Sequence, residues 1–288
     1  MLWVLPALGA ALALATADAL VKKFFSHLSP LQMGYVRLAY SAPWLLPLLL
    51  LTPAPHLDSD FWLMLAAVIP LEFLALYLYM DAIRSSPLSL TVPFLSFTPV
   101  WMILSGWVLL GELPSRTGAA GILLVAAGAY VLNLDRRRHG LLEPIKAVFR
   151  EPGSRKMMAV SAIYALTATA GKKLILLSSP TYFGAMYFLT LAALLTPALW
   201  SRDRAGFHRV FARPWWGLAV GLSQVVMVLF HVWAITLTQA SYMIAVKRLS
   251  LVFAVLYGRL VFGEAGFGLR LAGASLMFSG VIVLGAWG

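Results

Sequence analysis

The segment KKFFSHLSPLQMG, residues 22–34, returns as KKLILLSSPTYFG at residues 172–184. The two lysines, the Ser-Pro step and the final glycine of these segments lie 150 positions apart. A second match pairs Leu-Gly-Glu at 110–112 with Phe-Gly-Glu at 262–264, at an offset of 152, so only a small insertion separates the two anchors. The chain is therefore a tandem duplication. We place its two domains at residues 1–140 and 141–288.

The composition indicates a chain that lies in a lipid bilayer, because 61% of its residues are hydrophobic, 11% are charged and the mean hydropathy is +0.86. These values are typical of an integral membrane protein. Apolar runs long enough to cross about 30 Å of hydrocarbon begin near residues 2, 31, 61, 88 and 117, and again near 157, 181, 215, 240 and 269. We predict an all-α integral membrane protein with ten transmembrane helices in two five-helix repeats, surrounded by the lipid bilayer.

Basic residues concentrate in loops that fall on one face of a ten-helix chain. The loops 136–156 and 201–214 carry half of all Lys and Arg residues, whereas the opposite face holds the acidic stretch 58–60. The positive-inside rule therefore puts the basic loops in the cytoplasm and both termini outside. Because five is an odd number, the second repeat must enter the membrane in the opposite sense, as an inverted repeat. A chain rich in Ala, Leu and Arg suits a multi-pass protein of a bacterial inner membrane.

The remaining composition excludes several classes of function. These loops account for most of the net charge of +11, so we do not expect nucleic acid as a partner. Cysteine is absent and the five histidines show no metal-ligand spacing, so we expect no metal site and no cofactor. The sequence has neither a nucleophile-base constellation nor a glycine-rich phosphate loop. We therefore expect neither an enzyme nor an ATP-driven pump.

Two basic pairs inside the apolar runs are the strongest candidates for a substrate site. Lys172 and Lys173 lie near the end of the sixth predicted helix, and Lys247 and Arg248 lie about two turns into the ninth. Because these helices run in opposite directions, both pairs are predicted at one level of the membrane. An intramembrane charge is costly, and a cluster of cations suits phosphate or carboxylate. The alternative is that lysines near helix ends extend to the membrane surface.

Other polar residues in the apolar runs are candidates for the same site. Glu72 lies near the middle of the third predicted helix, where it could couple transport to protons or pair with Arg37. In the second copy Gln224 stands at the position of Glu72, and His231 at that of Tyr79. Gln224, His231 and Tyr79 are candidate substrate-binding residues. The alternative for a single His or Gln in a bundle is an interhelical hydrogen bond.

Further repeated features indicate structural roles. Glu112 and Glu264 follow the glycine that ends a predicted helix, where a carboxylate can bind loop amides or a helix N-terminus. Asp18 precedes Lys22 by four residues and could pair with it. The glycines at 121, 128, 273 and 280 suit close helix packing or dimerisation, so a homodimer is one expectation.

The ten-helix duplication, with Pro99-Val100 before Leu110-Gly111-Glu112 and the following glycines, resembles the EamA-type domains of the drug/metabolite transporter superfamily. The resemblance implies a secondary carrier that works by alternating access without ATP. The two basic pairs are similar to those with which triose-phosphate/phosphate translocators hold phosphate. This likeness implies a small organic anion as substrate, with phosphorylated metabolites as one class, moved with protons or by exchange.

The alternative function is export of amino acids or other amphipathic metabolites. Tyr77, Tyr79, Trp101 and Tyr242 would then form a wide aromatic pocket, and the basic pairs would bind only the carboxylate of the substrate. Tyr242 is for this reason a further candidate substrate-binding residue. Flipping of a lipid-linked sugar is another alternative, which would need a lateral opening between helices.

Overall fold

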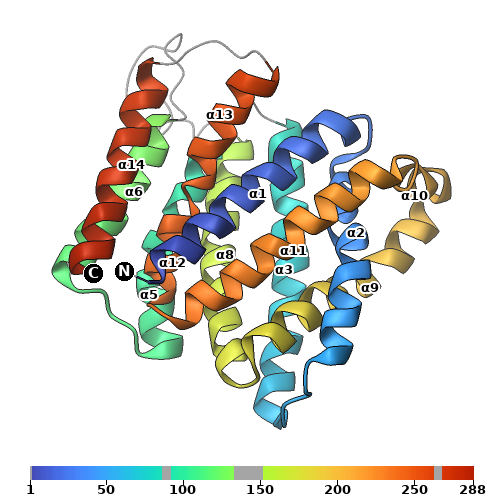
Figure 1. The fold of residues 1–288 in the computed structure, drawn as a ribbon, viewed down its shortest axis with the longest axis horizontal. Helices are drawn as coiled ribbons and strands as arrows, with labels where there is room; N and C mark the ends of the chain where they lie inside the picture. The colour runs from blue at the N-terminus through green and yellow to red at the C-terminus, as the bar shows by residue number, and fades with distance from the viewer. Residues whose placement is uncertain (1, 86–91, 133–151, 263–267) are drawn as a thin grey trace.

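The computed structural model describes residues 2–85, 92–132, 152–262 and 268–288. These residues form helices joined by short connections, and no strand occurs among them (Figure 1). The predicted all-α class is confirmed for this part of the chain. The helices are, in chain order, α1 (Val4–Phe25), α2 (Pro30–Leu51), α3 (Ser59–Ser85), the 3₁₀ helix η1 (Val92–Phe97), α5 (Thr98–Leu110), α6 (Arg116–Leu132), α8 (Pro152–Leu176), α9 (Pro180–Arg202), α10 (Arg204–Val210), α11 (Pro214–Thr236), α12 (Ala240–Lys247), α13 (Ser250–Phe262) and α14 (Gly268–Trp287).

The helices have the length and surface of membrane spans. Within the described residues, seven helical segments are long and apolar enough to cross a membrane. Three shorter apolar helices, Phe94–Leu110, Arg116–Leu132 and Leu271–Trp287, accompany them. Large apolar side chains such as Leu63 and Ile282 lie exposed, as expected for a surface in contact with lipid. The chain is therefore a multi-pass membrane protein, as its composition predicts.

The two repeats are interleaved. α1 of the first repeat packs along α11 of the second, and α3 of the first packs along α8 of the second. Under the sequence offset α1 corresponds to α8 and α3 to α11, so these two contacts are equivalent. α2 packs on its counterpart α9, and α6 on its counterpart α14, at opposite edges of the molecule (Figure 1). Polar side chains of α1, α3, α8 and α11 can therefore meet between the repeats.

The repeated Ser-Pro step is a helix start. Ser29 Oγ accepts a hydrogen bond from the Gln32 amide at 3.4 Å, and Ser179 Oγ accepts one from the Tyr182 amide at 3.4 Å. Proline follows each serine inside the first turn, where its missing N–H has no helical partner to lose. The short helix α10 in the loop after α9 was not predicted from the sequence. It begins at Asp203, whose side chain accepts from the Gly206 amide at 2.8 Å.

The glycines of the last helix in each repeat allow α6 and α14 to pack closely. A Cβ atom on Gly128 would lie 2.6 Å from the Met277 amide nitrogen and 2.7 Å from the Gly273 carbonyl oxygen. A Cβ on Gly273 would lie 2.3 Å from the Leu132 nitrogen. The glycine spacing therefore serves packing inside one chain. It gives no separate support to the homodimer considered above.

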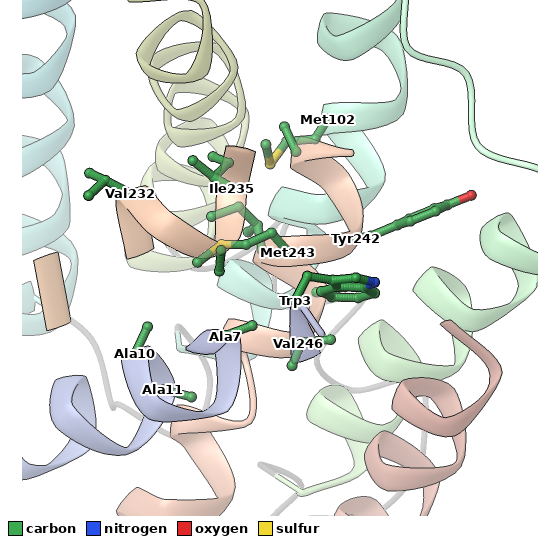
Figure 2. Packing of buried hydrophobic residues seen from close by; sticks show 14 of the residues in the cluster. Trp3, Ala7, Ala10, Ala11, Met102, Val232, Ile235, Tyr242, Met243 and Val246 are labelled. Atoms are coloured by element: carbon green, nitrogen blue, oxygen red, sulfur yellow. The ribbon is translucent and has the colours of Figure 1, made fainter. Parts of the chain in front are cut away.

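The first half of α1 packs through small side chains. Ala7, Ala10 and Ala11 are fully buried and belong to one cluster with Ile235 of α11 and Met243 of α12 (Figure 2). Small residues let helix backbones approach closely, which is a common mode of helix association in lipid. α1 also contacts α12, and both termini lie on this side of the molecule (Figure 1).

Candidate functional site

Two hydrogen-bonded contacts between the repeats lie at equivalent positions of the duplication. Arg37 of α2 donates from Nε and Nη2 to Gln224 Oε1 of α11, at 3.1 and 3.0 Å. Glu72 of α3 interacts with Tyr187 of α9 and with Thr167 of α8. Arg37 and Tyr187 differ by 150 positions, and Glu72 and Gln224 by 152. The same two positions are therefore in contact in both halves of the duplication. Arg37 is the charged residue of the first contact, and Glu72 is the charged residue of the second.

Arg37 has a second partner on α1. Its Nη1 atom lies 2.8 Å from Asp18 Oδ1, so Asp18 pairs with Arg37 and not with Lys22 as a helical neighbour. Arg37 likewise does not pair with Glu72, the other possibility that the sequence raised. The side chain of Asp18 is 55% exposed, and that of Arg37 is 24% exposed. Asp18 also interacts electrostatically with Lys247 of α12, which belongs to the other repeat.

Lys247 lies at the end of α12 beside His231 of α11. The Lys247 Nζ and His231 Nδ1 atoms are 3.1 Å apart, so one nitrogen donates to the other. Lys247 also interacts electrostatically with Glu72 and Asp18, one residue of each of the two groups described above. Arg248 follows directly and donates from Nη2 to Thr98 Oγ1 at 2.8 Å. The central polar cluster comprises these groups: Asp18, Arg37, Glu72, Gln224, His231, Lys247 and Arg248.

The spans predicted near residues 88 and 240 are each broken, and the breaks meet at this cluster. In the first repeat the 3₁₀ helix η1 gives way to α5 at Thr98, where Pro99 occupies the first turn of α5. In the second repeat α12 ends before Arg248, and the chain continues through i→i+3 bonds such as Leu251 N to Arg248 O at 3.0 Å. Thr98 and Arg248 are 150 positions apart, so the hydrogen bond between them joins equivalent points of the two repeats.

Lys172 is not part of the central polar cluster. Its Nζ atom forms an ion pair with Glu112 and donates to the Thr238 carbonyl at 2.5 Å. The other carboxylate oxygen of Glu112 accepts from the amide of Ala240, the first residue of α12, at 2.9 Å. Lys247 closes α12, about 10 Å further along its axis. The structure therefore does not bring Lys172 and Lys247 into one cluster, because Lys172 reaches the start of α12 and Lys247 lies at its end.

The remaining candidates divide between these two places. Tyr79 interacts electrostatically with Asp18, Arg37 and Arg248, and so adjoins the central polar cluster. Tyr242 is 3% exposed and accepts a hydrogen bond from the Ser115 amide at 3.0 Å, at the same end as Lys172. Its hydroxyl points away from the apolar cluster that contains its ring (Figure 2).

Two further candidates remain to be placed. Lys173 is half-buried and makes no side-chain hydrogen bond to a residue that the structure describes. Glu264 lies outside the described residues.

The aromatic pocket considered for the alternative substrate does not form. Tyr77 is 64% exposed, whereas Tyr79 adjoins the central polar cluster. Trp101 is 41% exposed and donates from Nε1 to Ser161 Oγ at 3.1 Å. Because Tyr242 lies near Ser115 at the end of the bundle, the four aromatic residues do not share one surface.

Asp18 is the functional candidate that sequence reasoning assigned to a local pair and thereby missed. The available signal was a carboxylate inside an apolar run, which is costly and calls for a partner. As to metals, the described part of the chain contains no group of three His, Asp or Glu residues that could hold an ion.

Comparison with known proteins gives a family and a fold. The sequence model of the EamA-like transporter family matches residues 1–134 and 153–286. A protein of known crystal structure superposes with a TM-score of 0.71 over 98% of this chain and 94% of that chain, at 16% sequence identity. The comparison with curated proteins gives no significant match. Each half of the duplication is thus similar to the same family, and the fold is shared with a solved structure.

Proposed function

The chain belongs to the EamA-like transporter family, and on this premise we propose that it is a secondary active transporter of a small organic anion. Members of the family are transporters, which agrees with the expectation that the chain is not an enzyme. We infer the anionic substrate class from the surroundings of the Arg248 side chain. Its Nε atom is buried without a hydrogen-bond partner among the described residues, although Nη2 binds Thr98. An unpaired buried donor is costly, and a guanidinium edge fits a carboxylate or phosphate.

The charges around Arg248 support an anionic ligand. Arg37, Lys247 and Arg248 bring three cations to the central polar cluster, where Asp18 and Glu72 supply two carboxylates. The cluster therefore retains an excess of positive charge when its arginines and Lys247 are protonated. Phosphorylated metabolites and carboxylates both fit this charge, and Gln224 and His231 add uncharged hydrogen-bonding groups beside it.

The architecture supports alternating access. Substrate sites of repeat-built carriers lie where the repeats meet, at helices that are interrupted near mid-membrane. The breaks at Thr98 and Arg248 meet between the repeats, in agreement with this plan. With η1–α5 and α12–α13 each counted as one span, the helices make ten spans in two inverted five-helix repeats, divided near residue 140. The basic loops then face the cytoplasm of a bacterial inner membrane, and Glu72 is the candidate for proton coupling if transport is not pure exchange.

A zwitterionic substrate such as an amino acid is the second candidate function. The observation in its favour is that Glu72 and Asp18 lie within electrostatic reach of Lys247, so opposite charges face the same space. An amino acid would place its carboxylate on the basic side and its ammonium group on the acidic side. A simple anion has no ammonium group and would not need the contact with Glu72 and Asp18.

The test uses the purified protein in a thermal-shift screen against phosphate esters, dicarboxylates, neutral amino acids and organic cations. A ligand that binds only the folded protein raises its melting temperature. We expect stabilisation by acidic compounds, lost in Arg248→Gln and Lys247→Gln and retained in the control Arg209→Gln, which alters the exposed helix α10. Stabilisation by neutral amino acids alone would favour the zwitterion. Stabilisation by organic cations alone would contradict both functions.

A further inference from the structure

Asp18 is a carboxylate of the central polar cluster without a charged counterpart in the other repeat. Its counterpart at an offset of 150 is Ala168, so the second repeat carries no carboxylate at this place. It lies on α1 between Ala17 and Val21, which are buried at 0% and 6% exposure, while its own side chain is 55% exposed. A carboxylate in a membrane-spanning helix is costly and needs a partner. The fold alone does not require this one.

The surroundings of Asp18 are those of an anion in a binding site. Arg37 is held by Gln224 through Nε and Nη2, which leaves Nη1 directed at Asp18 Oδ1. Lys247 acts on the same carboxylate from α12. Asp18 thus receives a charge-assisted hydrogen bond from one repeat and attraction from the other. A carboxylate or phosphate on a substrate would seek the same donors.

We propose that Asp18 is a built-in counter-ion, which occupies the cationic site of the empty transporter and is displaced by the substrate anion. This role presupposes the proposed anion transport. In the empty state Asp18 compensates Arg37 and Lys247, so that the carrier can change conformation without exposing unpaired buried cations. In the loaded state the substrate supplies that negative charge, and Asp18 turns its carboxylate to the exposed side. Asp18 therefore weakens anion binding and permits the return of the empty carrier.

This assignment predicts opposite effects on binding and on net transport. In Asp18→Asn the substrate no longer competes with an internal carboxylate, so the apparent dissociation constant for an anion should fall by about 10-fold or more. The empty carrier then keeps uncompensated cations, so net uptake should be lost. Counterflow, in which the carrier returns loaded, should be retained. A salt bridge of purely structural value would instead lower stability and give no gain in anion affinity.

The experiment titrates wild-type protein, Asp18→Asn and Asp18→Ser with inorganic phosphate and with succinate, and follows the melting temperature. The same proteins are then compared in proteoliposomes for net uptake and counterflow of the labelled anion that binds. Asp18→Ser serves as the second neutral variant should Asn distort α1. Asp58→Asn is the matched control, since Asp58 is 70% exposed and lies before α3, and it should behave as wild type.

The outcomes separate this inference from the proposed function. Tighter anion binding with counterflow retained and net uptake lost supports the counter-ion. Equal or weaker anion binding by both Asp18 variants overturns it while the anion site stands. Absence of binding of either anion to wild-type protein overturns the proposed anion transport, and the counter-ion role with it.

Discussion

Replacement of Glu112 by Gln tests the ion pair that joins the repeats at the start of α12. Glu112 follows Gly111, which takes a left-handed conformation with φ of 68° and turns the chain out of α5. Its carboxylate joins the Lys172 ammonium to the Ala240 amide. In Glu112→Gln the amide oxygen can keep the bond to Ala240. The amide NH₂ group then faces the Lys172 ammonium, whose remaining acceptor is the Thr238 carbonyl.

The size of the effect follows from burial. The side chains of Lys172 and Glu112 are 7% and 20% exposed, so the charge left on Lys172 is poorly solvated. Removal of one partner from a buried ion pair costs about 3–5 kcal/mol of unfolding free energy. Because Glu112→Gln keeps the bond to Ala240, we expect its loss to be about 3 kcal/mol. Removal of both charges in Lys172→Met with Glu112→Gln should bring the loss back to about 1 kcal/mol, because no unpaired charge remains.

The measurement is the free energy of unfolding of detergent-solubilised protein from denaturant titration, for both single variants and the double variant. The coupling energy of this cycle should exceed about 1.5 kcal/mol. Lys156→Met is the control, because Lys156 and Asp81 form a pair with side chains 30% and 36% exposed, and it should cost less than about 1 kcal/mol. A coupling energy near zero, with Glu112→Gln no worse than Lys156→Met, would refute the reasoning.

Three further predictions concern packing, a helix start and a helix break. Gly128→Ala should lower the free energy of unfolding by about 1–3 kcal/mol, since its Cβ would collide with α14. The control Gly171→Ala should be neutral or stabilising, because no atom lies within 4 Å of the new Cβ. Equal melting temperatures of the two variants would contradict this. Ser29→Ala should cost about 1 kcal/mol of unfolding free energy by removing the cap of α2, and no loss would show that proline alone fixes that start. Thr98→Val should cost about 1–3 kcal/mol by leaving Arg248 Nη2 without its acceptor, and thermal unfolding as stable as wild type would contradict that contact.

Much of the fold could be predicted because the duplication repeats its local signals. Ser29-Pro30 and Ser179-Pro180 start helices in both copies, and the apolar runs between such signals have the length of membrane spans. The break before α5 has a visible cause in Pro99. The break at Arg248 has none, since neither proline nor glycine interrupts α12 and α13 there. It results from tertiary packing, which hydrophobic periodicity does not report.

The site could be predicted only in part, because partner choice depends on the rotation and depth of whole helices. Sequence reasoning identified Lys247, Arg248 and Glu72 as intramembrane charges, and the structure places all three in the central polar cluster. Sequence reasoning could not separate Lys172 from these three residues. The partner of Lys172 is Glu112, whose position depends on its bond to the start of α12. Asp18 was assigned to its i+4 neighbour, although its ion-pair partner is Arg37 on α2 of the same repeat, whose other donors bind Gln224 of the second repeat.

The difference between the repeats has an energetic consequence for alternating access. If the repeats were identical, the inward-open and outward-open conformations of the carrier would have equal free energy, because exchange of the repeats would convert one into the other. The contacts of α1 on α11 and of α3 on α8 retain this equivalence in their backbone packing. Charged side chains break it, since Asp18 and Arg37 of the first repeat correspond to Ala168 and Tyr187 of the second. Side-chain divergence in a symmetric scaffold would therefore set the resting conformation of the empty transporter, and the substrate anion would reduce that bias by replacing Asp18.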